Sequence, residues 1–218
     1  MKSILFTLLF VLSVGTISAQ TTEGQISYKL DFSSDNPEMA MALPMMQGST
    51  MELYFAKDKS AANVTMGSMM TMKSVVDVKS DKGIVLVDAM GQKIATKIES
   101  IKNSKNKAEK APTPQATSET KKIIGFNCTK YIAKDTSGNG EDFVFWVTKE
   151  LKTSLVGQEQ FNSNIDGVPL EFSTMQQGMK VHFIATDFKK TVDANVFKID
   201  VPEGYRVMTE DQIKGMGM

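Results

Sequence analysis

The sequence has few of the side chains on which catalytic and metal centres most often depend. Its 218 residues include one histidine, His182, one cysteine, Cys128, and one arginine, Arg206. A single cysteine cannot form an internal disulfide, and a serine or cysteine nucleophile usually needs a nearby base. Lysine plus arginine equals aspartate plus glutamate at 25 each, so no net positive field attracts nucleic acid. We therefore expect a protein that is not an enzyme, and we assign it no catalytic residue, metal ligand, cofactor or nucleic acid partner.

Long apolar runs are also scarce, and the one that is present lies at the N-terminus. Lys2 precedes an apolar run at 4–14, and the residues at 17–19 are typical of a signal cleavage site. The run is shorter than the roughly 20 residues that span a bilayer. Residues 1–19 are therefore predicted to be a cleaved signal peptide. Residues 20–218 are predicted to form one periplasmic or secreted domain with no integral membrane segment.

Alternation of apolar and polar residues dominates the rest of the chain. Residues 26, 28, 30 and 32 are apolar and the residues between them are polar, which is typical of a strand with one buried face. Comparable runs occur at 51–55, 64–66, 70–72, 84–87, 94–98, 124–128, 143–147, 170–172 and 181–183. Short turn signals separate many of them, and Asn139-Gly140 suits a tight hairpin. The pattern predicts a mainly β fold, with roughly nine to eleven antiparallel strands in a sheet that closes or curls.

Two segments interrupt the strand pattern. The segment 36–46 has Pro37 where a first helical turn tolerates it, and we expect a short apolar helix between the first two strands. Its apolar residues fall on roughly one helical face: Met39, Ala42, Leu43 and Met46. The segment 102–122 has no apolar side chain larger than alanine or proline, so it is predicted to be a flexible surface loop. Near the C-terminus, Thr209 and Gln212 have the spacing of a capping box for a short helix.

Cys128 and His182 both fall in strand-like runs. Cys128 shares the apolar parity of residues 124 and 126, which favours a buried and inert thiol. His182 alternates with the apolar Val181 and Phe183, which favours an exposed or edge histidine over a catalytic one.

Methionine is the one residue type in clear excess, with 16 in the chain. Nine of them fall within one stretch: Met39, Met41, Met45, Met46, Met51, Met66, Met69, Met70 and Met72. Thioethers bind soft Cu(I), so a methionine-rich copper-binding protein is one hypothesis. Methionine also lines adaptable surfaces that accept variable partners or acyl chains, and it fills ordinary cores. The sequence leaves these three interpretations open.

A resemblance to a known family rests on five segments: Gly24–Leu30, Met66–Met72, Ile124–Tyr131, Phe145–Thr148 and Val201–Tyr205. Together they resemble the exported bacterial proteins of domain-of-unknown-function family 4412. That family is similar in turn to periplasmic lipoprotein carriers of the LolA and LolB type. The resemblance implies a curved antiparallel sheet that forms an open half-barrel, with one or two short helices covering a concave apolar face that receives acyl chains. The chain departs from LolB in lacking a lipid-attachment cysteine after the signal.

From these observations we expect an exported protein that binds a lipid or another apolar ligand, such as a lipoprotein acyl chain, in the concavity of the sheet. The helix at 36–46 would be its displaceable cover. The candidate lining residues are Met39, Leu43, Met46, Met66, Met70, Met72 and Phe145. Two alternatives remain open: a non-enzymatic structural or interaction protein of the cell envelope, whose protein partner the sequence does not identify, and the copper-binding protein.

Overall fold

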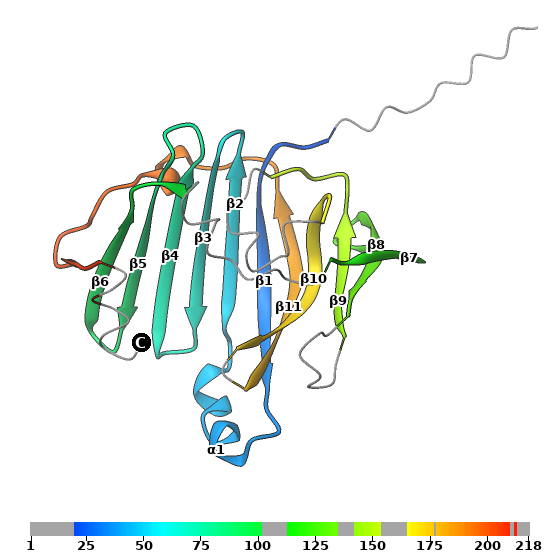
Figure 1. The fold of residues 1–218 in the computed structure, drawn as a ribbon, viewed down its shortest axis with the longest axis horizontal. Helices are drawn as coiled ribbons and strands as arrows, with labels where there is room; N and C mark the ends of the chain where they lie inside the picture. The colour runs from blue at the N-terminus through cyan, green and yellow to red at the C-terminus, as the bar shows by residue number, and fades with distance from the viewer. Residues whose placement is uncertain are drawn as a thin grey trace, which may run out of the picture.

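The computed structural model describes residues 20–101, 113–134, 142–153, 165–176, 178–209 and 212. The predicted signal peptide at 1–19 and the predicted turn at Asn139-Gly140 lie outside these residues. The described part of the chain is mainly β (Figure 1). Its strands are β1 (Glu23–Ser33), β2 (Thr50–Ala56), β3 (Lys59–Met66), β4 (Met70–Asp77), β5 (Lys82–Ala89), β6 (Gln92–Ile98), β7 (Gln115–Ile123), β8 (Phe126–Ala133), β9 (Phe143–Thr148), β10 (Val168–Gln176), β11 (Met179–Lys189) and β12 (Arg206–Val207).

All of these strands belong to one open 12-stranded sheet, with the order β12-β6-β5-β4-β3-β2-β1-β11-β10-β9-β8-β7. The predicted antiparallel pairing is confirmed for every neighbouring pair except β12, which lies parallel to β6. Consecutive strands form two meanders, β1–β6 and β7–β11. The pairing of β1 with β11 joins these two meanders into one sheet.

Alternation gives the sheet two different faces. We call the side that carries Ile26, Tyr28 and Leu30 of β1 the apolar face, and the other side the reverse face. These three side chains are at most 4% exposed, and they belong to one large cluster that extends over β1, β2, β3 and β7 to β11. A row of aromatic rings crosses this face, because cross-strand register places Phe145 opposite Phe172 and Phe172 opposite Phe183.

A β-bulge in β11 keeps its apolar residues on the apolar face. Ser27 pairs with Asp187 but Tyr28 pairs with Ala185, so Thr186 is an extra residue in the ladder. One extra residue reverses the side to which the following side chains point. Phe188 therefore lies opposite Ile26 on the same face as Ala185, although the two residues are three positions apart and would point to opposite faces of a regular strand.

Two contacts link strands that are not neighbours in the sheet. The Tyr28 ring extends past the small Ala185, and its hydroxyl donates a hydrogen bond to the Pro169 carbonyl of β10 at 2.9 Å. Before β1 begins, Thr21 forms a parallel bridge with Leu151, beyond the end of β9. These contacts therefore bring the start of the described chain close to β10 and to the residues that follow β9, although β11 and β10 lie between β1 and β9 in the sheet.

The reverse face is covered over β3 to β6 by the chain that follows β11. The 3-10 turn η2 (Ala194–Phe197) places Phe197 in a second cluster with Ala61, Val75 and Ile84. The chain then reaches the edge of the sheet, where the Met208 amide donates to the Ala95 carbonyl at 2.9 Å. The predicted capping box is confirmed by reciprocal hydrogen bonds between Thr209 and Gln212.

The segment between the first two strands is helical, as predicted, but it does not cover the apolar face. It forms the short helix α1 (Pro37–Ala40), capped by Asn36, and the 3-10 turn η1 (Leu43–Met46). Neither contains a buried residue, and both lie beyond the end of the sheet (Figure 1). The predicted cover over the concave face is therefore corrected. Pro44 opens a separate 3-10 turn, so the apolar stripe of 39–46 is divided between two short turns at the strand ends.

The predicted loop at 102–122 also requires a correction. Residues 115–122 form most of β7, which pairs with β8 at the edge of the sheet. Its polar composition, with Glu119, Lys121 and Lys122, suits an exposed edge strand, where charges oppose further pairing. Residues 102–112 lie outside the described part of the chain.

The buried hydroxyl of Tyr28 provides a test of its contact with β10 across β11. Tyr28→Phe removes the donor to the Pro169 carbonyl and leaves that buried acceptor without its partner, which is expected to lower the free energy of unfolding by about 1–3 kcal/mol. Urea unfolding measures the loss. Tyr205→Phe, at a half-buried tyrosine on the reverse face, is the matched control and is expected to change stability little. Equal midpoints for the two variants would contradict the structure.

Candidate functional site

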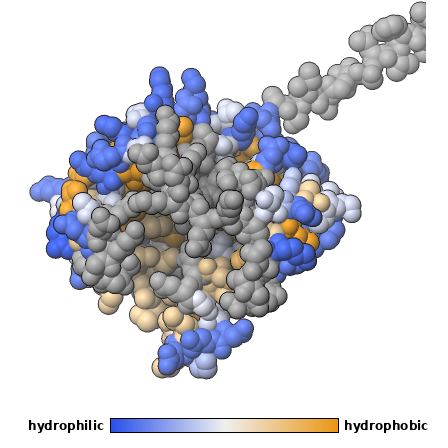
Figure 2. Space-filling view, in the orientation of Figure 1, coloured by the Kyte–Doolittle hydropathy of each residue, from blue (hydrophilic) through white to orange (hydrophobic). Residues whose placement is uncertain are grey.

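Methionine side chains gather at one end of the sheet, where α1 and η1 connect β1 to β2. Hydrogen bonds tie the turns of this end together: the Met90 amide donates to the Met69 carbonyl at 3.3 Å, and Ser34 Oγ donates to the Gly178 carbonyl at 2.9 Å. We call this region the methionine end; its members are Met39, Met41, Met45, Met46, Met66, Met69, Met70, Met90 and Met175. Weakly hydrophobic surface gathers in the lower part of Figure 2, next to α1.

The methionine end is apolar and exposed. Among the described residues, five large hydrophobic side chains are exposed, and four are methionines of this end: Met41 (83%), Met45 (54%), Met90 (89%) and Met175 (56%). The fifth, Val207, lies in β12 at the edge of the sheet. Scattered exposed apolar residues are ordinary, but a cluster of them often marks an interaction site.

A glycine and a buried serine attach η1 to the sheet. Ser49 is 1% exposed; its Oγ donates to the Met46 carbonyl at 2.6 Å and accepts from the Gly67 amide at 3.0 Å. Gly67, in the β3–β4 turn, has φ +50°, and a Cβ on it would lie 1.9 Å from the Met45 carbonyl oxygen. The absence of a side chain at Gly67 therefore lets η1 pack directly on this turn.

The predicted lining residues divide into three groups. Met39, Leu43 and Met46 are half-buried in the α1–η1 segment at the end of the sheet. Met66, Met70 and Met72 are half-buried in β3 and β4, and Met66 and Met72 pack against the main apolar cluster. Phe145 is buried within that cluster, where its ring is stacked with Phe172. The first two groups meet at the β3–β4 turn, and Phe145 lies on β9, on the other side of β1 in the sheet.

Sequence reasoning did not include Met90 or Met175 in the site. Both lie far along the chain from the methionine-rich stretch, and only the strand order brings their hairpin tips to the same end. The one local signal is that each lies close to a turn glycine of positive φ, Gly91 or Gly178.

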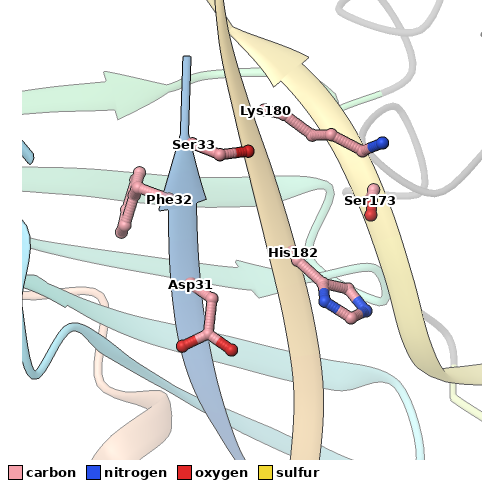
Figure 3. A pocket seen from close by; sticks show the side chains of 6 residues that line it. All are labelled: Asp31, Phe32, Ser33, Ser173, Lys180 and His182. Carbon is pink, nitrogen blue, oxygen red and sulfur yellow. The ribbon is translucent and has the colours of Figure 1, made fainter. Parts of the chain in front are cut away.

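A concavity of about 350 Å³, with both polar and apolar lining, lies on the reverse face. Its lining residues come from β1, β10 and β11: Asp31, Phe32, Ser33, Ser173, Lys180 and His182. Register places Asp31 opposite His182, and His182 opposite Ser173. Figure 3 shows the ring of Phe32 pointing away from the other five side chains.

The row Asp31–His182–Ser173 contains the residue types of a nucleophile triad but not its hydrogen bonds. Asp31 is paired with Lys29 at 3.0 Å, and His182 Nε2 lies 3.6 Å from Glu171 Oε1. Within the described residues, no hydrogen bond joins Ser173 to His182, and a nucleophile needs its base within hydrogen-bond reach. His182 alternates away from Val181 and Phe183 as predicted, but it lies on a central strand and its side chain is 38% exposed.

The carboxylate beside His182 already has a cationic partner. Glu171 Oε2 lies 2.7 Å from Lys121 Nζ, and the same ammonium lies 4.3 Å from the centre of the Trp146 ring. A partly exposed pair of this kind contributes modestly to stability. The reverse face here is a charge-balanced surface, with Lys121 reaching from the edge strand β7 to β10.

No metal centre of the usual kind is found in the described part of the chain, where no three His, Cys, Asp or Glu side chains come together in a suitable group. None of the helices in this part of the chain is long and apolar enough to cross a membrane.

Cys128 is buried in β8, as predicted for a packing residue. Burial raises the pKa of its thiol to about 11, with nearby Glu150 adding to the shift and Lys121 opposing it. At neutral pH the side chain is therefore protonated and a poor nucleophile.

The raised pKa of Cys128 predicts a loss of stability in alkali. Unfolding releases this thiol to an ordinary pKa near 9, so its contribution is complete below about pH 9 and is lost as the pH rises toward 11. Between pH 8 and pH 10.5 the free energy of unfolding should fall more steeply for the wild type than for Cys128→Ala. Urea titrations at the two pH values measure this, and parallel pH profiles would contradict the burial.

The packing of η1 on the β3–β4 turn is tested by two turn glycines. Gly91→Ala meets nothing within 4 Å and is expected to cost about 1–2 kcal/mol from positive φ alone. Gly67→Ala has the same kind of strain and must also displace the Met45 carbonyl, so its cost is expected to exceed that of Gly91→Ala by about 1–3 kcal/mol. Urea unfolding compares them. Equal costs would show that η1 does not contact this turn.

The fold of this chain is similar to that of a protein of known structure. No protein-family model matches the chain, and no match is found among curated proteins. A structure of PNGF-II in space group P21 is similar over 89% of this chain and 33% of its own, with TM-score 0.51 and 19% identity. An uncharacterised conserved protein from Thermus thermophilus aligns over 87% of this chain and 91% of its own, with TM-score 0.48 and 11% identity. The chain thus spans about a third of the PNGF-II structure, and at 19% identity the likeness concerns the fold alone.

Proposed function

We propose that this chain is an exported, non-enzymatic binding protein of the family 4412 type, and that it takes a lipid or another apolar chain against the apolar face of a half-barrel sheet. The ligand enters at the methionine end. The single observation that carries this proposal is the continuity of two apolar surfaces. The turn η1, which carries the exposed Met45, packs on the β3–β4 turn that follows Met66. Met66 and Met72 in turn pack against the main apolar cluster.

The half-barrel rests on the two contacts that cross intervening strands. Tyr28 reaches Pro169 over β11, and Thr21 bridges Leu151 over both β11 and β10. A flat sheet would hold β1 and β9, three positions apart, at about 14–15 Å, beyond direct backbone pairing. In this proposal the curvature makes the apolar face concave toward the ligand, which would contact side chains that are buried in the structure.

The short helical turns have a different role from the one first expected. Because α1 and η1 lie beyond the strand ends, Met39, Leu43 and Met46 belong to the entrance and do not cover the concavity. Met66, Met70 and Met72 mark the passage from entrance to face, and Phe145 belongs to the aromatic row within. Unbranched methionine side chains adapt to ligands of different shape.

Affinity should depend on the length of the apolar chain. Each buried methylene contributes about 0.8 kcal/mol, close to a fourfold change in affinity, until the available surface is filled. Titration of a displaceable fluorescent fatty acid with saturated acids of increasing length measures this. We expect affinity to rise with length and then level off.

Matched variants locate the entrance. Met41→Lys with Met45→Lys places two charges among the exposed methionines and should weaken acyl-chain binding by about tenfold or more. Val207→Lys, at the exposed apolar residue on β12, is the control and should bind as the wild type does. Native mass spectrometry of protein recovered from a periplasm should also reveal a bound apolar species. Absence of that species together with absence of fatty-acid uptake would overturn the proposal and favour an interaction protein of the envelope.

A further inference from the structure

We infer that Met66, Met70 and Met72 form a thioether site for a soft monovalent cation of the Cu(I) or Ag(I) class. This inference is independent of the proposed apolar ligand, because it depends on sulfur and not on apolar area. Thioethers are soft ligands with weak affinity for Mg²⁺, Ca²⁺ or Zn²⁺, so a group composed of methionine selects this class of ion.

Strand register brings the three side chains together. Met66 of β3 is paired directly with Met70 of β4, and Val64 is paired with Met72. Directly opposed residues share a face with Cβ atoms about 4.5–5.5 Å apart, and diagonal pairs such as Met66 and Met72 lie about 7–8 Å apart. Residues 70 and 72 are two positions apart on one strand, about 6.6–6.8 Å. The three Cβ atoms thus form a triangle small enough for flexible thioether arms to converge on one ion.

The surroundings contain few competing ligands. The other cross-strand neighbours of Met70 and Met72 are Ala89 and Val87, which have no side-chain donor atoms. Alternation places Thr71 and Lys73 on the reverse face, so the Lys73 ammonium does not share the side of the sheet that would hold the cation.

The three methionines are partly exposed, so an ion can reach them, and partly buried, so the site is shielded from water. All three methionines are half-buried, and Met66 and Met72 also pack against the apolar cluster. A partly dehydrated apolar site disfavours strongly hydrated cations, whereas soft thioether bonds can replace the hydration of Cu(I). Cys128 is buried in β8, six positions from β3 in the strand order, so its thiol is not part of this group.

Packing alone does not account for methionine at all three positions. Burying methionine costs more side-chain entropy than burying leucine, about 1.5–2 against about 0.5–1 kcal/mol. Leucine has a similar volume and would serve as well for filling space. The turn η1 also brings the backbone of a fourth methionine close to the β3–β4 turn, since a Cβ on Gly67 would lie 3.2 Å from Met46 Cα.

Silver titration of the mature protein tests the site, because Ag(I) is a stable mimic of Cu(I) that needs no reductant. Isothermal titration calorimetry should give one tight equivalent for the wild type. With methionine methyl groups labelled with ¹³C, the same titration should shift the signals of Met66, Met70 and Met72. The triple variant M66L/M70L/M72L should lose the tight equivalent, with affinity reduced by about tenfold or more.

Two controls show whether a loss of silver binding comes from unfolding or from the general loss of methionine. Thermal unfolding of the triple variant should match the wild type, since leucine preserves volume and apolarity. The variant M41L/M45L/M90L removes three exposed thioethers of the methionine end and should keep the tight equivalent. Absence of tight binding in the wild type, its retention in the first variant, or an equal loss in both variants would each overturn the site. Fatty-acid binding is measured on the wild-type protein without silver, and silver binding without fatty acid, so failure of the metal site and failure of the proposed function are distinguishable.

Discussion

The pairing of β1 with β11 is the constraint on which the rest of the structure depends. Every other antiparallel pair of the sheet joins strands that follow one another in the chain, whereas β1 and β11 lie near opposite ends of the described residues. The bulge at Thr186 sets the register so that Ala185 leaves room for the Tyr28 ring while Phe188 remains on the apolar face. The contact of Tyr28 with Pro169 across β11 follows from that register.

The alternation of apolar and polar residues predicts most of the strands because each has one buried face. It does not predict β7, since an edge strand gains its order from pairing with β8 and its exposed side chains carry no apolar signal. The pairing of β1 with β11 also could not be predicted. Alternation shows that a segment is a strand with one buried face, but it does not identify the strand with which it pairs. The bulge at Thr186 could not be predicted either. The sequence shows that Ala185 and Phe188 are three positions apart, but the pairing with β1 is needed to show that both lie on the same face.

The candidate site was predictable in composition but not in placement. Clustering along the chain identified Met66, Met70 and Met72, which the β3–β4 hairpin brings together through local pairing. Helical periodicity at 36–46 indicated an apolar stripe but not the surface that it contacts, and the Ser49 and Gly67 contacts place that stripe at the strand ends. The reverse-face concavity draws on three strands, so no local motif could identify it.

The most direct test of the central pairing is native-state hydrogen exchange of the amides in β1 and β11, followed as a function of low urea concentration. If this ladder holds the two meanders together, its paired amides should be among the slowest to exchange and should exchange only through global unfolding. The edge strands β7 and β12 should exchange through local opening. Exchange of the β1 and β11 amides through local opening, while β3 to β5 stay protected, would contradict the account.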